Sequence, residues 1–205
     1  MNEAGNGRRF EVINSGVGNY NTEMELAYYV DEGHRYNPDL VILNYFINDA
    51  EPRPSRAINP LAQWSMAYVF IAGRVDTLVR LARGRVDWAA YYLGLHADDA
   101  PGWRVAKDSI VAIKRFAETK GSRVLFANYP ELRDLKTYRF AAVNRALEAL
   151  AKDNGIPYID LLDAVRGHDE RTLWVTPPDP HPNANANDRF AKALFAKLQA
   201  EFGRP

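Results

Sequence analysis

The sequence predicts an α/β fold, in which helices cover both faces of a mostly parallel β-sheet. Short, apolar, β-prone runs alternate along the chain with longer stretches whose apolar residues recur at a spacing of three and four. These stretches are long enough to serve as the crossover connections that parallel strands require. With 205 residues, 47% of them apolar, the chain is long enough to bury one core, and we expect a single domain over residues 1–205.

The first part of the chain supplies two predicted strands and one helix. Residues 10–14 are β-prone, and a capping box at Thr22 to Glu25 then begins an amphipathic helix that runs to about Tyr36. The Asn37-Pro38 pair ends this helix, because the residue before a proline is disfavoured in helical conformation. Residues 39–45 form an apolar run, which predicts a strand that is buried on both faces.

A helical insertion over the sheet is predicted at about residues 58–100, with apolar residues at helical spacing from Val75 to Ala82. Its most apolar part, residues 61–73, is interrupted by polar residues and is shorter than the roughly 20 residues of a membrane-spanning helix. We expect this part to be buried helix, so a membrane partner is not expected. An interfacial anchor or lid for lipid substrates is the minority interpretation.

The second half of the chain continues the alternation of strands and helices. The predicted elements are a helix at 103–120, a strand at 122–128, a helix at 136–154, a strand at 157–160, a loop that ends near residue 183 and a last helix at 186–202. In open parallel sheets, binding sites form beyond the carboxyl ends of the strands. The loops that follow the strands are therefore the candidate positions for a site.

Charge and composition exclude several classes of function. Lysine plus arginine and aspartate plus glutamate both number 26, so no net field draws the protein to nucleic acid or to an anionic membrane. The absence of cysteine excludes disulfides, thiolate catalysis and Cys-ligated zinc. The four histidines are scattered, so we expect neither a metal nor another cofactor. The first nine residues lack the pattern of a secretory signal, which leaves a cytoplasmic and a periplasmic location equally open.

The first candidate loop, residues 14–22, joins a predicted strand to a helix. Its glycines, Gly16 and Gly18, permit unusual backbone angles, and the following helix N-terminus favours developing negative charge. Taken alone, a tight strand-to-helix turn is the simpler interpretation. A dinucleotide-binding fingerprint fails, because Asn21 stands where the third glycine belongs and no acidic residue ends the next strand.

Two further loops hold polar residues that a plain connector does not need. The side-chain amide of Asn48, just after the 39–45 strand, could donate a hydrogen bond to an oxyanion. Asp179 and His181 lie two residues apart in a proline-rich segment, so both side chains can point the same way and the carboxylate can orient the imidazole as a general base. For either loop alone, an ordinary turn is the better interpretation.

Taken together and in this order, the three segments resemble the second, third and fifth sequence blocks of the SGNH/GDSL hydrolases. They read Asn14-x-Gly16-Val17-Gly18-Asn19-Tyr20-Asn21-Thr22, then Ile47-Asn48-Asp49, then Asp179-Pro180-His181-Pro182-Asn183. The resemblance implies a flavodoxin-like, three-layer α/β/α fold and a serine hydrolase that acts on a small acyl or acetyl ester, including carbohydrate-linked esters.

The resemblance also implies a role for each matched residue. His181 corresponds to the general base, Asp179 to the carboxylate that orients it, and Asn48 to the side-chain donor of the oxyanion hole. The glycine of the family's second block falls on Asn19, with Gly18 one place earlier, so the backbone amide of either residue could be a further donor. The spacing of two between Asp179 and His181, in place of the commoner three, is a departure from the family pattern.

A larger departure concerns the nucleophile. The family carries a Gly-Asp-Ser block on a strand upstream of the Asn-x-Gly loop, and none of the five serines here, Ser15, Ser55, Ser65, Ser109 and Ser122, lies in that context or in Gly-x-Ser-x-Gly. We therefore expect an N-terminally truncated domain that lacks its first, nucleophile-bearing strand and is catalytically inactive. The alternative hypothesis is a non-catalytic domain of the same fold that binds a glycan or a partner. The oligomeric state stays open.

Overall fold

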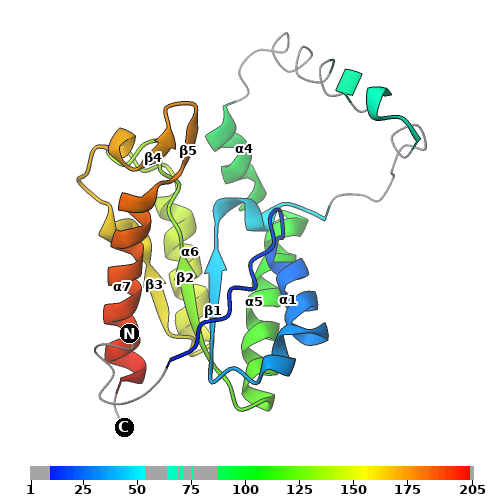
Figure 1. Cartoon of the computed structure of the whole chain (residues 1–205), viewed down its shortest axis with the longest axis vertical. Helices are drawn as coiled ribbons and strands as arrows, with labels where there is room; N and C mark the ends of the chain where they lie inside the picture. Colours follow the sequence, from blue (N-terminus) through cyan, green and yellow to red (C-terminus); the bar gives the residue numbers. More distant parts are fainter. Residues whose placement is uncertain (1–9, 54–63, 69, 72–74, 76–86, 204–205) are drawn as a thin grey trace.

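The computed structural model describes residues 10–53, 64–68, 70–71, 75 and 87–203. Its centre is a parallel, three-stranded sheet in the order β1 (Leu40–Tyr45), β2 (Arg123–Asn128) and β3 (Tyr158–Asp160) (Figure 1). The register pairs Leu40 with Arg123 and Phe126 with Tyr158. The predicted α/β fold class with a mostly parallel sheet is confirmed.

Helices build a layer on each face of this sheet. One core joins the sheet to α1 (Thr22–Asp31), α5 (Pro101–Thr119) and α6 (Ala141–Asp153), and the other joins it to α7 (Ala184–Phe202). Phe126 lies in the first core and the next residue of β2, Ala127, lies in the second. Because successive side chains of a strand point to opposite faces, β2 is covered on both sides, as the three-layer arrangement requires.

The outer strand β1 differs from the prediction of burial on both faces. Leu43 and Tyr45 are buried in the first core, whereas Ile42 and Asn44 on the other face are exposed. Helix α7 packs over the 3₁₀ helix η4 (Leu161–Ala164) beyond β3, and no described helix covers the second face of β1. The prediction was wrong because an apolar run does not reveal that its strand lies at the edge of the sheet.

The prediction of a strand at residues 10–14 is also wrong. This segment has no regular secondary structure, and Val12 is 82% exposed. A β-prone sequence forms a strand only where a neighbouring strand satisfies its backbone groups, and none of the described strands pairs with this segment.

The first helix is divided and begins differently from its prediction. Helix α1 ends at Asp31, and a 3₁₀ helix, η2 (Gly33–Tyr36), completes the stretch predicted to be one helix. The cap is Asn21 rather than Thr22, because Asn21 adopts extended backbone angles and its side chain accepts a hydrogen bond from Met24 N.

Of the last two helices, the first begins later than predicted and the second begins earlier. Helix α6 begins at Ala141 instead of residue 136, and α7 begins at Ala184, two residues ahead of its prediction. The connection before α7, predicted to be a loop, contains the 3₁₀ helix η5 (Glu170–Thr172) and an antiparallel pair of short strands, β4 (Trp174–Thr176) and β5 (Asp179–Pro182).

Much of the predicted helical insertion lies outside the described residues. Its described end is α4 (Trp88–Leu95), which packs on the first core through the buried Ala89. In the apolar part, Trp64, Met66, Phe70 and Ile71 are exposed, so the prediction of burial is wrong for these residues. Among the described helices, none is both long and apolar enough to cross a bilayer.

Candidate functional site

The site begins with Asp179 and His181, which lie on β5. As alternate residues of a strand they share a face, and His181 Nδ1 lies 2.5 Å from Asp179 Oδ1. The backbone N–H of His181 also donates to Asp179 Oδ1 at 3.2 Å. Both bonds lower the pKa of Asp179, and the side-chain bond is the larger cause. The carboxylate is therefore ionised and holds the imidazole through Nδ1. The His181 side chain is 80% exposed, and no hydrogen bond from its Nε2 is found among the described residues.

Asn183 holds the β4–β5 pair against the last helix. Its side-chain oxygen caps α7 by accepting from the backbone N–H groups of Asn185 and Ala186. Its amide nitrogen donates to the carbonyls of Thr172 and Trp174, at 2.9 and 3.0 Å. One side chain therefore anchors the strand pair that carries the dyad. The sequence placed Asn183 in the motif without a role, although an asparagine before a helix is a frequent cap.

Asn48 lies on a 3₁₀ helix, η3 (Ile47–Ala50), directly after β1. Its neighbours Ile47, Asp49 and Ala50 are buried, and Asn48 itself is half-buried. Asp49 Oδ2 accepts from the backbone N–H of Phe46 at 2.9 Å, which closes the turn. Figure 1 places this turn and the β4–β5 pair at the same end of the sheet, the end toward which β1 points.

The loop of residues 14–21 has the backbone shape of a specialised turn. Asn19 adopts a left-handed conformation with φ of 64°, and Tyr20 N donates to Val17 O at 3.2 Å. Within the described residues, the backbone N–H groups of Gly18 and Asn19 donate to no acceptor, and both residues are exposed. Both are therefore free to donate to a ligand.

Asn21 connects this loop to the Asn48 turn, a link that the sequence analysis missed. Its amide nitrogen donates to the carbonyl of Glu51 at 2.8 Å, while its oxygen caps α1. Helix α5 approaches the same turn through Gly102, where an added Cβ would lie 2.0 Å from the carbonyl oxygen of Ala50. The buried side of the turn is thus held from two helices.

Two acids interact on the inner side of the turn: the buried Asp49, which belongs to η3, and the half-buried Glu25 of α1. Burial raises the pKa of Glu25 to about 7. Burial, and then the charge of Glu25, raise the pKa of Asp49 well above its usual range, against the lowering effect of the Phe46 N–H bond. Burial and the charge of Asp49 raise the pKa of Tyr45 as well. No described cation pairs with either acid, so the uncharged forms are favoured.

The described serines do not complete a triad with His181. Ser122 Oγ donates to Pro38 O at 2.6 Å, Ser109 is buried within α5, and Ser65 Oγ accepts from the backbone of Tyr68. Ser15 is exposed in the first loop and has no contact with His181, and Ser55 lies outside the described residues. Among the described residues, no three histidine or acidic side chains form a group that could hold a metal ion.

The chain matches the model of the GDSL-like lipase/acylhydrolase family over residues 3–189. It belongs to this family. Membership makes ester hydrolysis the expected activity class and an ester the expected substrate class. The left-handed angle of Asn19 is one that a glycine adopts readily. A search of curated proteins found no match to the chain.

Proposed function

We propose that this GDSL-family chain is a single domain with the acid–base half of an acyl- or acetyl-ester hydrolase site. His181 is the general base and Asp179 orients it. Asn48 donates its side-chain amide, and Gly18 or Asn19 a backbone N–H, to the oxyanion. The observation that most supports this is the 2.5 Å bond between Asp179 and His181 Nδ1, which leaves Nε2 to take a proton from a nucleophile.

The chain as given is proposed to be inactive, because no described serine can pass its proton to His181. A serine on a strand along the open edge of β1 would supply the missing nucleophile, as a parallel strand there would end near Asn48. Its hydroxyl would attack the ester carbonyl, His181 would take its proton, and the donors would stabilise the oxyanion.

Hydrolysis of p-nitrophenyl acetate tests this proposal. The chain is compared with a version extended at its N-terminus by a strand that ends in Gly-Asp-Ser, and each is also made with His181→Ala. We expect turnover only in the extended version, with a loss on the order of 10³-fold on removing His181. His34→Ala is the matched control, because η2 lies before β1, at the opposite end of the sheet.

If the extended version folds but does not turn over the ester even at high concentration, the hydrolase proposal fails. The alternative, a non-catalytic domain that binds a glycan or a partner through the same region, would then take its place. Turnover by the unextended chain that survives His181→Ala would contradict the assigned roles.

A further inference from the structure

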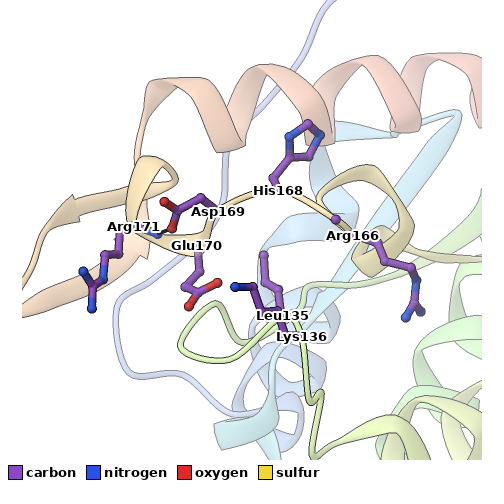
Figure 2. Close-up of a pocket in the computed structure, with 8 residues that line it drawn as sticks. Leu135, Lys136, Arg166, His168, Asp169, Glu170 and Arg171 are labelled. Atoms are coloured by element: carbon purple, nitrogen blue, oxygen red, sulfur yellow. Dashed lines mark hydrogen bonds between the residues drawn. The ribbon is translucent and has the colours of Figure 1, made fainter.

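The proposed function leaves unused a cavity and an exposed apolar segment. The cavity, of about 810 Å³, is lined by residues 135–136 and 166–171 (Figure 2). Its cations lie beside two carboxylates, those of Asp169 and Glu170, so it favours neither an anionic nor a cationic ligand. The apolar segment, residues 64–75, has a more specific chemical character.

Five apolar side chains of this segment are exposed in the described part of the chain, and we call them the apolar surface: Trp64, Met66, Phe70, Ile71 and Val75. Trp64 and Met66 are 87% and 81% exposed, and the other three are each more than half exposed. Single exposed apolar residues are common on proteins. Several large ones close together in the chain mark a site of interaction with a protein or a membrane.

The length of the apolar stretch restricts the structures that it can form. The stretch runs from Leu61 to Gly73 and is shorter than the roughly 20 residues of a membrane-spanning helix. An apolar stretch of this length is typical either of a core helix or of a segment that lies in the membrane interface. The exposure of Trp64, Met66 and Ile71 excludes a core helix at these positions, so the interfacial interpretation takes its place.

The sequence around the apolar surface is basic, although the whole chain has no net charge. Residues 54–86 contain five arginines and one aspartate, and they contain neither lysine nor glutamate. Positive charge next to exposed apolar side chains is the combination that binds anionic phospholipid, because the apolar groups enter the interface while the arginines attract the lipid phosphates. A second copy of the chain is a poorer partner, because a symmetric contact would bring two basic segments together.

We propose that the apolar surface inserts into the headgroup interface of an anionic phospholipid membrane. Tryptophan is favoured at this depth, because its ring is apolar while its indole N–H stays in contact with polar headgroups. Arg56 and Arg74, which precede and follow the stretch from Leu61 to Gly73 in the sequence, supply positive charge for the lipid phosphates. This inference goes beyond the proposed function and does not rest on it, because membrane binding requires neither a nucleophile nor His181.

Flotation of the full chain with lipid vesicles tests the proposal. One set of vesicles contains equal parts of phosphatidylglycerol and phosphatidylcholine, and the other contains phosphatidylcholine alone. We expect the chain to float with the anionic vesicles, to bind the neutral vesicles at least about tenfold more weakly, and to be released from the anionic vesicles by salt. A chain that stays in solution beside the anionic vesicles, or that binds both sets equally, would overturn the proposal.

Two valines provide a matched pair of variants. Val75 and Val175 are 52% and 53% exposed, but Val75 belongs to the apolar surface and Val175 to β4. We expect Val75→Ser to weaken binding to the anionic vesicles about threefold and Trp64→Ser about tenfold or more, because each loses apolar area that enters the lipid. Val175→Ser should bind like the wild type. Equal losses in the two valine variants, or no loss in Trp64→Ser, would reject the apolar surface as the binding site.

A second copy of the chain and an added segment of the chain are the competing occupants of the apolar surface. Sedimentation velocity without lipid tests the first: we expect no dimer that depends on Trp64, and a dimer that Trp64→Ser dissociates would overturn the proposal. The version extended by a Gly-Asp-Ser strand tests the second. We expect it to bind the anionic vesicles as the unextended chain does, and loss of binding on extension would show that the added strand covers the surface and would contradict the proposal.

Discussion

At the scale of single residues, the contact between Asp179 and His181 shows how two exposed side chains become one chemical unit. Neither is held by packing, because both are open to solvent. Their mutual orientation comes from alternate positions on β5 and from two hydrogen bonds that converge on one carboxylate oxygen. The proline on each side of His181 restricts the backbone and thereby the side-chain directions.

The pKa of Asp179 reports this contact. The side-chain bond from His181 is the main cause of its lowered pKa, followed by the backbone bond that alanine would retain. We expect His181→Ala to raise the Asp179 pKa toward its ordinary value without restoring it fully, as measured by carbon-detected NMR titration of the carboxyl. An unchanged pKa would show that the two side chains are not joined in solution.

Glu25 should make the stability of the protein depend on pH. Its pKa is raised from 4.5 to about 7 by burial, so the folded state favours the protonated form. The stability that this proton contributes is fully present below pH 4.5 and is lost as the pH rises through about 7. We expect a loss on the order of 2 kcal/mol across this interval in urea unfolding.

Glu25→Gln is the variant that isolates this effect. It removes the titrating group, and it also removes a charge that raises the pKa of Asp49. The dependence of unfolding free energy on pH between 5 and 8 should therefore be shallower in the variant. Glu32→Gln, on an exposed residue paired with Arg35, is the comparison and should keep the wild-type slope. A wild-type slope in Glu25→Gln would rule out this assignment.

At the scale of elements, the approach of α5 to η3 sets the position of the Asn48 turn. The helix comes so close at Gly102 that no side chain fits against Ala50 O. Only glycine allows this contact, and the turn that carries Asn48 rests on it.

Gly102→Ala should push α5 and η3 apart. We expect a destabilisation of about 1–3 kcal/mol, typical of overpacking, in urea unfolding. We also expect shifted NMR signals for the side-chain amide of Asn48. Gly94→Ala is the matched control, because Gly94 is exposed within α4 and an added Cβ meets nothing within 4 Å. Gly94→Ala should stabilise the folded protein by about 0.5–1 kcal/mol, because alanine has a higher helix propensity than glycine. Equal effects at the two positions would contradict the close contact.

At the scale of the whole molecule, the sheet ends at β1, whose outer backbone groups pair with no described strand. The carbonyls of Asp39 and Tyr45 accept hydrogen bonds from the segment of β2. Since backbone directions alternate along a strand, residues 40, 42 and 44 direct their polar groups to the open edge. An unpaired edge of this kind invites an additional strand.

Hydrogen exchange tests this arrangement. The amides of Ile42 and Asn44 should exchange on the order of tenfold or more faster than those of Leu43 and Tyr45, because only the latter face β2. In the version extended by a Gly-Asp-Ser strand, Ile42 and Asn44 should become protected. Equal protection of all four amides in the unextended chain would show that another segment already covers the edge.

The sequence determined the fold class, the alternation of helices with the three strands of the parallel sheet, and the residues of the three motifs, because periodicity, caps and prolines act locally and are readable in the chain. It also placed Asp179 and His181 on one face, since their spacing of two in an extended segment decides that. Only the tertiary structure decided that residues 10–14 form no strand and that β1 is half exposed. It alone revealed the link from Asn21 to Glu51, the contact at Gly102 and the interaction of Asp49 with Glu25. The physical reason is that strand pairing and burial depend on neighbours distant in sequence, which no local pattern specifies.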